Sequence, residues 1–435
     1  MVDQVSKSDD CAQIRRIWHS DQLVEAAHRP LRLLTFTTLF PHNGRPNHGI
    51  FVENRLRHLV TSGEATSTVI APVPWFPSRS PFFGEWAKNA GAGRQEDRGQ
   101  IKVYHPRFPL PPRIGMLSAP GSLFIAGARE LSRLMKTGLE IDVIDGHYIY
   151  PDGVAAVALG RLFKKPVVLT ARGSDVTQYP SFRLPARMIR WAMRNASALI
   201  SVSSGLKSGM IDLGAAEQKI TVLRNGVDLQ QFRPTDPEAA QKDWGVNQKI
   251  LISVGHLIER KRHDLTIEAL KFLPGWTLVL VGDGSEKLRL QALVSKLGLA
   301  ERVIFSGQKP HADLSSLYAG ADISVLSSSR EGWANVLLES MACGTPVVAS
   351  NIPGNPEVVT SLAAGLIVRE NTPACFAQTI QQLYQIKLSR LQTREYAEAF
   401  DWDATTQGQL RVFRNVIAAA AARDSLVNSS FSASR

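Results

Sequence analysis

The sequence is poor in cysteine and has no long apolar run. Its three cysteines, Cys11, Cys343 and Cys375, are odd in number and too far apart for a zinc site. This usage indicates a reducing compartment and no disulfide framework. No run approaches the roughly 18 apolar residues that span a bilayer, and the acidic residues among the first 25 positions make a poor secretion signal. We therefore expect a cytoplasmic protein whose membrane contact is at most peripheral.

Two nucleotide-binding signatures and a convincing metal motif are also missing. No GxGxxG follows the first predicted strand, which argues against a nicotinamide dehydrogenase. No GxxxxGK[ST] occurs, which excludes a P-loop enzyme. Asp401-Trp402-Asp403 formally matches a metal-binding D-x-D. Oxygen-rich divalent sites need more ligands than this pair supplies, so we expect no metal.

The sequence does have a 44% hydrophobic content and a strong basic excess. The hydrophobic content rules out a wholly disordered chain. The formal charge of +11 predicts an anionic partner, such as nucleic acid, a phosphorylated ligand or a membrane surface. Residues 1–215 carry a net charge of +10 and residues 216–435 only +1, so the excess lies in the amino-terminal half. Basic residues are not interleaved with stacking aromatics, so nucleic acid is not an expected partner.

Strand and helix patterns alternate along most of the chain. Apolar runs such as 166–170 and 276–281 have strand length and are separated by helix patterns. This alternation predicts an α/β fold with two doubly wound parallel sheets, which bind ligands in a cleft at the carboxyl ends of their strands. The expected organisation is a flexible extension 1–28, an amino-terminal domain 29–227, a linker 228–243, a carboxy-terminal domain 244–390, helices 391–422 that pack back on the amino-terminal domain, and a disordered tail 423–435.

The most informative segment is 327–344, SSSREGWANVLLESMACG. It follows a strand pattern, which places Glu331 in the loop at the carboxyl end of that strand. Glu339 lies eight residues later, in a helix that starts near Asn335. A helix N-terminus presents unpaired N–H groups that suit a phosphate, and a carboxylate beside it can accept sugar hydroxyls. From the spacing alone, a capped surface helix with ordinary acidic residues is an equally good interpretation.

This segment resembles the E-x7-E region of the retaining family-4 glycosyltransferases (glycosyl transferases group 1), which have the two-domain GT-B fold. VGHLIERKRHDLTIEAL, LVGDGSEKLRL, VIFSGQKP and MACGTPVVASNIPGNPEVV follow in the family's order. In the amino-terminal half, TTLFPHNGRPNHGIFVE, GHYIYPDGVAA and LTARGSDV also resemble family motifs. The resemblance covers the chain from residue 31 to about 413. It implies a GT-B fold and sugar transfer from a nucleotide-diphosphate sugar, such as a UDP- or GDP-sugar, with retention and without a metal or other cofactor.

The resemblance also implies roles for individual residues. Glu331 would hold hydroxyls of the donor sugar, Glu339 would bind the ribose, and Lys261 would pair with the diphosphate and stabilise the leaving group. His147, which follows strand 141–145, would contact the donor sugar. The expected site comprises catalytic Glu331, Lys261 and His147; donor-binding His256, Arg262, Gln308, Gly332, Trp333, Ala334, Asn335, Val336 and Glu339; and, in the phosphate loop or near the acceptor, Gly44, Gly49 and Arg172.

Three positions depart from the family pattern. His256 stands where the family often has Arg, and a neutral imidazole carries little charge at pH 7. Arg262 stands where many members have Gly, and we expect it to supply the missing charge. Arg172 replaces the His of a T-x-H-G motif, and we expect it to face the cleft toward an anionic acceptor.

A basic stripe indicates a membrane surface as a further partner. Arg183, Arg187, Arg190 and Arg194 recur every three or four residues, so they share one helix face that could lie on an anionic bilayer. A core-packed helix with a solvated face fits equally well. With the resemblance, this predicts transfer to a lipid-linked or glycan acceptor at the inner face of a bacterial membrane, in envelope or exopolysaccharide synthesis. A nucleotide-sugar 2-epimerase of the same fold and a non-catalytic, membrane-docking relic remain alternatives.

Overall fold

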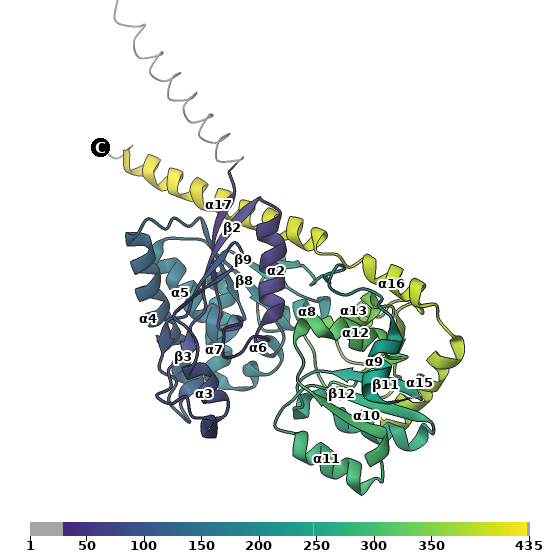
Figure 1. The fold of residues 1–435 in the computed structure, drawn as a ribbon. Coiled ribbons are helices and arrows are strands. Elements are labelled where there is room, and N and C mark those ends of the chain that lie inside the picture. The colour runs from purple at the N-terminus through teal and green to yellow at the C-terminus, as the bar shows by residue number, and fades with distance from the viewer. Residues whose placement is uncertain (1–28, 247, 433–435) are drawn as a thin grey trace, which may run out of the picture.

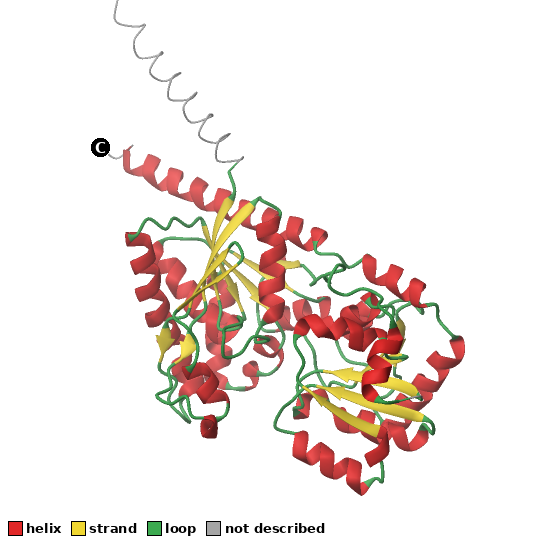
Figure 2. Cartoon of the chain, viewed as in Figure 1, coloured by secondary structure: helices red, strands yellow, loops and turns green. Residues whose placement is uncertain are grey.

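The computed structural model describes residues 29–246 and 248–432 and shows two α/β halves, each organised around one sheet (Figures 1 and 2). The strands of the amino-terminal half are β1 (Leu31–Phe36), β2 (Ala65–Ile70), β3 (Val73–Pro74), β4 (Gln95–Arg98), β5 (Ile101–Tyr104), β6 (Arg107–Phe108), β7 (Val143–His147), β8 (Val167–Ala171), β9 (Ala198–Ser201) and β10 (Ile220–Val222). Its helices are α2 (Ile50–Thr61), α3 (Glu85–Ala90), α4 (Gly115–Lys136), α5 (Val154–Phe163), α6 (Ser174–Thr177), α7 (Arg183–Asn195) and α8 (Ser204–Asp212).

The amino-terminal sheet has the strand order β10-β9-β8-β7-β1-β2-β5-β4, and β3 pairs separately with β6. Its strands are parallel except for the antiparallel pair β4 and β5. The strand order reverses between β1 and β7, which pair with Leu33 opposite Val143. Parallel neighbours need helical crossovers, which here cover both faces of the sheet. The predicted doubly wound architecture is therefore confirmed for this half.

The carboxy-terminal half has the same architecture with six strands. They are β11 (Lys249–Val254), β12 (Trp276–Val281), β13 (Val303–Gly307), β14 (Ile323–Leu326), β15 (Val347–Ala349) and β16 (Gly365–Ile367), in the order β13-β12-β11-β14-β15-β16 and all parallel. The helices are α9 (Pro237–Trp244), α10 (His263–Ala269), α11 (Lys287–Lys296), α12 (Leu314–Ala319), α13 (Asn335–Ala342), α14 (Asn355–Val358), α15 (Pro373–Ile386) and α16 (Arg390–Glu398). All six residues of β12 are buried, as expected for a strand covered on both faces.

The last helix, α17 (Asp403–Ser432), leaves the carboxy-terminal half and lies along the amino-terminal half (Figure 1). Its Leu410 and Phe413 pack into a core cluster with Leu33 and Val52. Residues 423–432, which we expected in a disordered tail, continue this helix. The alanine-rich run before them has high helix propensity and favours continuation of the helix, whereas the composition of the tail alone predicts no helix. The expected extension 1–28 and residues 433–435 lie outside the described residues.

Two other expected segments differ from the structure. The second half of the expected linker forms α9, because Asp236 caps it by accepting the N–H of Glu238 and Pro237 occupies the first helical position. Helix α16 packs on α13 within the carboxy-terminal half rather than on the amino-terminal domain. There Arg394 donates hydrogen bonds to the carbonyls of Phe232 and Ala342. Only α17 therefore returns to the amino-terminal sheet.

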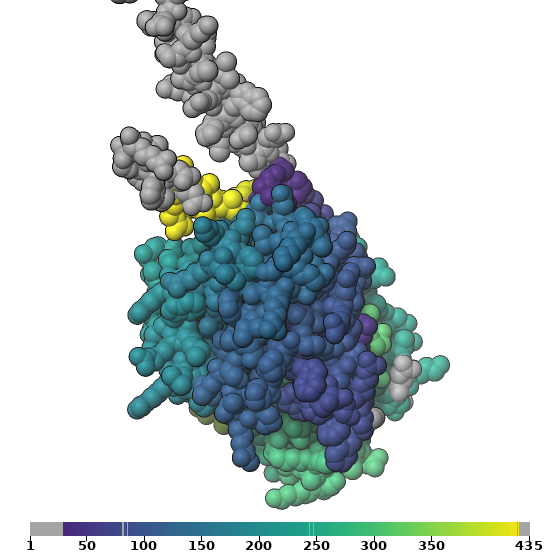
Figure 3. Space-filling view, turned by 90° about the vertical axis from the view of Figure 1, so that its left-hand side faces the viewer, coloured from purple at the N-terminus to yellow at the C-terminus, as the bar shows by residue number. Residues whose placement is uncertain are grey.

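The surface is formed by both halves. In Figure 3 the amino-terminal half fills most of the face turned to the viewer, and the carboxy-terminal half projects below it. Among the described helices, none is both long and apolar enough to cross a membrane. Cys343 is buried, Cys375 is partly exposed, and neither forms a disulfide.

Candidate active site

A cavity of about 450 Å³ lies between the two halves. Its walls are the loops that follow the strands. Leu39, Tyr148 and Arg172 follow β1, β7 and β8, while Gly255 and Gly282 follow β11 and β12. The carboxyl ends of both sheets therefore meet at this cavity, where doubly wound sheets bind their ligands. This position agrees with the cleft expected from the sequence.

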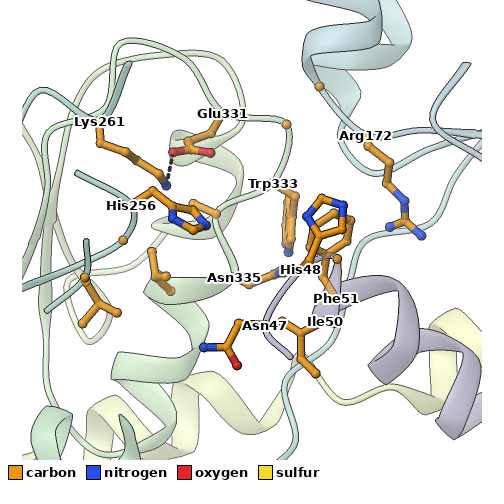
Figure 4. A pocket seen from close by; sticks show the side chains of 18 of the residues that line it. Asn47, His48, Ile50, Phe51, Arg172, His256, Lys261, Glu331, Trp333 and Asn335 are labelled. Carbon is orange, nitrogen blue, oxygen red and sulfur yellow. Dashed lines mark hydrogen bonds and ion pairs between the residues drawn. The ribbon is translucent and has the colours of Figure 1, made fainter. Parts of the chain in front are cut away.

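The centre of the carboxy-terminal wall is an ion cluster of Lys261, Glu331 and Arg260. Lys261 Nζ lies 2.7 Å from Glu331 Oε1 (Figure 4), and Arg260 Nη1 lies 3.1 Å from Glu331 Oε2. The two cations come from the 3-10 turn Glu259–Lys261 after β11, and the carboxylate comes from the loop after β14. Strands β11 and β14 are adjacent at the point where the strand order reverses. The topology thus brings together residues that are 70 positions apart in the chain.

Glu331 is held as a carboxylate. Burial alone would raise its pKa, but attraction from Lys261 and then Arg260 outweighs burial and leaves the pKa below its usual value. The side chains of Lys261 and Glu331 are only 11% and 10% exposed, so both charges act in a weakly screened environment. A negative group and two positive groups at one cavity wall can bind hydroxyls and phosphate side by side.

The loop before α13 and its first residues form the adjacent wall. Gly332, Trp333, Ala334, Asn335 and Val336 all line the cavity, as expected. The α13 N-terminus therefore lies at this wall with its partial positive charge. Such an arrangement suits a diphosphate.

Glu339 lies one turn further along α13 and also lines the cavity. His311 Nε2 lies 3.1 Å from its Oε1, and the hydroxyl of Tyr318 donates to its Oε2 at 3.2 Å. Burial tends to lower the pKa of His311, but the hydrogen bond and charge of Glu339 raise it overall. The Glu339 carboxylate is thus held in one orientation at the cavity edge.

The departures His256 and Arg262 lie in different places. His256 and Gln308 line the cavity, and the pKa of His256 is lowered first by burial and then by Lys261, which keeps its imidazole neutral. Arg262, which we expected to supply the missing charge, does not line the cavity. Its φ of 49° turns it away, and its Nε donates to Asp264 at 3.1 Å. Arg260 lies at the site in its place.

His147 is buried behind the cavity wall rather than lining it. Its Nε2 lies 3.0 Å from Asp145 Oδ2, and its Nδ1 lies 2.6 Å from Arg172 Nη2. Burial is the largest cause that lowers the pKa of His147 to about 4. The neutral ring therefore accepts from Arg172 and donates to Asp145. Because both ring nitrogens are engaged, the imidazole positions its neighbours and leaves only its backbone for a ligand.

Arg172 does line the cavity, and it connects the two halves through Asn225. Arg172 Nη1 donates to Asn225 Oδ1 at 3.2 Å, and Asn225 Nδ2 donates to Asn335 Oδ1 at 3.1 Å. The indole of Trp333 donates to the Asn225 carbonyl at 3.1 Å. The side chain that replaces the family's His is thus part of a hydrogen-bond network that reaches the start of α13.

The two loop glycines have different roles. Gly49 lines the cavity with a φ of 68°, a left-handed conformation that favours glycine. Gly44 does not line it; a Cβ there would lie 2.1 Å from the carbonyl oxygen of Lys88. Gly44 therefore permits close packing of its loop on α3 rather than access for a ligand.

The charged residues that line the cavity have a small basic excess. Its lining includes five basic residues, Arg172, Arg260, Lys261, Lys309 and Arg330, against three acidic ones, Asp283, Glu331 and Glu339. Several lining residues were not predicted, among them Asn47, His48, Phe51 and Arg260. Asn47 and His48 lie in the motif TTLFPHNGRPNHGIFVE and Arg330 lies in segment 327–344, whereas Asn225 has no distinguishing signal in the sequence.

The remaining predicted residues lie outside this cavity. Arg183, Arg187, Arg190 and Arg194 are exposed on α7, whose Ile189, Ala192 and Met193 are buried against the core. Asp401 Oδ1 accepts the backbone N–H of Asp403 at the start of α17. In the described part of the chain, no three His, Cys, Asp or Glu side chains are grouped so that they could hold a metal ion.

Two family models match the two halves of the chain. Glycosyl transferases group 1 matches residues 235–400, and Glycosyltransferase Family 4 matches residues 63–231. The ion cluster and α13 lie within the first match, and Arg172 lies within the second.

Individual glycosyltransferases and a solved structure also match the chain. A D-inositol 3-phosphate glycosyltransferase of Frankia alni is 30% identical over 308 residues, which is 64% of this chain and 75% of the relative. A protein of the same name from Acidothermus cellulolyticus is 35% identical over 228 residues, 48% of this chain, and the chain spans about half (51%) of that relative's length. The structure of Anabaena HepE in complex with UDP and glucose has a TM-score of 0.67 at 21% identity, covering 89% of this chain and 100% of that one.

Proposed function

The chain belongs to the group 1 glycosyltransferases, and on this premise we propose that it transfers a sugar from a nucleoside diphosphate sugar to an acceptor hydroxyl. The observation that carries the proposal is the Lys261–Glu331–Arg260 cluster beside the α13 N-terminus. A carboxylate for hydroxyls and cations for phosphate, held within hydrogen-bond distance of each other, match a sugar linked to a diphosphate. We further propose that transfer proceeds with retention and without a metal ion.

When the donor binds, different members of the ion cluster would contact its diphosphate and its sugar. The diphosphate would take Lys261 and the first-turn N–H groups of α13, and sugar hydroxyls would replace Lys261 as partners of Glu331. Glu339, oriented by His311 and Tyr318, is placed to accept hydroxyls of the nucleoside ribose. The five basic against three acidic lining residues favour an anionic ligand. The HepE structure, solved with UDP and glucose, supports a donor of this class.

The proton balance of this transfer needs no group beyond the substrates. The acceptor oxygen bonds to the anomeric carbon as the bond from that carbon to the diphosphate oxygen breaks, and the hydroxyl proton leaves with the nucleoside diphosphate. Cations beside the diphosphate stabilise the charge that develops on it. In this geometry His147 keeps Arg172 in place rather than transferring a proton.

The test compares Glu331→Gln with Glu259→Gln. Glu259 lies two residues before Lys261, is exposed and does not line the cavity, so it is a matched control. A thermal-shift screen of nucleotide sugars identifies the donor, and turnover is then measured with a glycan acceptor. We expect Glu331→Gln to lose turnover at least 100-fold while still binding the nucleoside diphosphate, and Glu259→Gln to match wild type. Full turnover by Glu331→Gln would refute the assignment.

Two further measurements test the mechanism and separate it from related activities. NMR of the product's anomeric carbon tests retention, and turnover in a strong chelator tests metal independence. Interconversion of the donor without an acceptor would instead indicate an epimerase. Absence of nucleotide binding would indicate a non-catalytic relic.

We also propose that the protein works in the cytoplasm, at the inner face of a membrane, on a lipid-linked or glycan acceptor. The exposed arginines of α7 support this proposal, since each basic residue near an anionic surface contributes about 1 kcal/mol. A variant with Arg187→Glu and Arg190→Glu should lose binding to anionic liposomes but keep its affinity for the donor. Unchanged liposome binding would remove the support.

A further inference from the structure

A second cavity of about 490 Å³ lies in the amino-terminal half, next to the first. It is bounded by the loop after β1, the β3–β6 pair, Trp86 of α3 and the start of α4. His48 lines both cavities, so they meet at this side chain. In Figure 4 His48 lies among the side chains that line the first cavity. The second cavity therefore opens beside the place proposed for sugar transfer.

The second cavity is mostly apolar. Val73, Phe108, Leu110, Met116 and Tyr150 contribute to its lining, together with several prolines. Its volume is within the range of small-molecule sites, which bind apolar groups through such walls. A polar glycan alone would leave much of this surface without a matching partner, whereas a hydrocarbon chain would cover it.

The apolar lining continues to the protein surface. Trp86 and Met116 line the cavity and are still 39% and 37% exposed, so they lie at its mouth. The ring of Trp86 contacts Phe76, which contacts Phe83, which contacts Phe82, with centroids 5.1–5.6 Å apart. Phe82 is 89% exposed. We call Phe76, Phe82, Phe83 and Trp86 the aromatic patch. Exposed apolar patches of this kind mark binding sites.

The charged residues among the described lining of the second cavity are arginines. Arg45 and Arg113 line it together with His42, and none of its described lining residues is acidic. The pKa of His42 is lowered to about 4, first by burial and then by His105, His48, Arg45 and Arg107. The neighbouring carboxylate, Asp152, lies behind Thr38 with a pKa raised by burial to about 8, and Glu96 is paired with Arg98. Two arginine side chains therefore lie beside the apolar walls.

We propose that this second cavity binds the hydrocarbon chain of a lipid phosphate acceptor, with the phosphate toward Arg45 and Arg113 and the reacting hydroxyl toward His48. The inference rests on the proposed function, since it names the acceptor class and places it. The chain enters past Trp86 and Met116 from the aromatic patch. The acceptor head then reaches the donor in the first cavity through the junction at His48.

Met116→Glu and Leu117→Glu form a matched pair for the test. Both residues lie in the first turn of α4, where a carboxylate is favourable, so both variants should fold. Leu117 is 40% exposed, close to Met116, but does not line the cavity. Glutamate at position 116 puts a negative charge into the cavity mouth, while at position 117 it changes only the outer surface.

The probe is farnesyl phosphate, titrated calorimetrically below its micelle concentration, with farnesol and inorganic phosphate as comparisons. We expect wild type to bind farnesyl phosphate at least tenfold more tightly than either comparison. Met116→Glu should weaken this binding at least tenfold and Leu117→Glu less than twofold. Binding of UDP and GDP to wild type is measured in parallel. If wild type binds neither nucleotide, the proposed function fails, but the assignment of the second cavity as a lipid site does not.

Three outcomes would overturn the inference. They are no binding of farnesyl phosphate by wild type, equal weakening of binding by the two variants, and binding of farnesol as tight as that of farnesyl phosphate. If wild type binds anionic vesicles but not farnesyl phosphate, the aromatic patch is a membrane-contact surface and the cavity is not the acceptor site.

Discussion

The ion cluster allows a prediction in which stability and catalysis are measured separately. Lys261→Met keeps most of the side chain's volume but removes its charge, leaving Glu331 with Arg260 as its charged partner. For charges 2.7 Å apart, Coulomb's law at an effective dielectric of about 20 gives a gross interaction of roughly 6 kcal/mol. Breaking a buried pair usually costs about 3–5 kcal/mol. Because Arg260 remains 3.1 Å from the carboxylate, we expect a smaller loss, about 1–3 kcal/mol in the free energy of unfolding.

Turnover should fall by more than this stability loss would explain. If Lys261 neutralises the leaving diphosphate, its removal should lower kcat by about 10²–10³, the effect of losing one transition-state charge partner. The free energy of unfolding is measured by urea denaturation and kcat with saturating donor, for wild type, Lys261→Met, Glu331→Gln and the double variant. The double variant should recover part of the lost stability, giving a coupling of about 0.5–3 kcal/mol. Additive stability effects together with unchanged kcat would refute both the pair and its role.

Three further predictions concern groups near the two cavities. Asp152 is fully buried and its pKa is raised to about 8, so the folded state binds its proton more strongly than the unfolded state. The free energy of unfolding therefore falls as the pH rises from about 4 to 8, by up to about 1.4 kcal/mol per pH unit. Asp152→Asn should flatten this slope, measured by urea denaturation at pH 5 and 8. Gly332→Ala would place a Cβ 2.0 Å from the Arg172 carbonyl oxygen, so solution scattering should show a wider spacing of the halves, with reduced kcat. Asn225→Ala leaves Arg172 and Asn335 without this partner and should cost about 1–3 kcal/mol in urea denaturation, whereas an unchanged midpoint would show that the network is not stabilising.

The fold and the location of the site could be predicted from the sequence because both depend on periodicity. Buried parallel strands such as β12 are continuous apolar runs, and their alternation with helices admits few topologies. The carboxyl-end rule then predicts that Lys261 and Glu331 lie at one cleft. The strand order that makes β11 and β14 neighbours is a tertiary property, and the spacing of the two residues does not contain it.

The residues within the site were harder to predict because tight turns do not have a fixed side-chain period. In the 3-10 turn Glu259–Lys261, consecutive side chains point in different directions, and the left-handed φ of Arg262 redirects the next one. Arg260 therefore reaches Glu331, while Arg262 pairs with Asp264. By contrast, Asp145 and His147 are two apart on β7, so strand alternation alone puts them on one face. Their hydrogen bond could have been predicted, but the engagement of His147 by Arg172 could not.

Net charge has the same limitation, because a sum of charges over a stretch of sequence ignores where the charged residues lie in the fold. The carboxy-terminal half is nearly neutral overall, yet Arg260, Lys261, Lys309 and Arg330 all come from it to line one cavity. Fields act over about 10 Å at ordinary ionic strength, so a diphosphate responds to the arrangement of these four residues and of the lining carboxylates Asp283, Glu331 and Glu339, and not to the net charge of the half. The neutral His256 is thus no obstacle to anion binding at the first cavity. Arg260, four residues later in the chain, lines the cavity and pairs with Glu331.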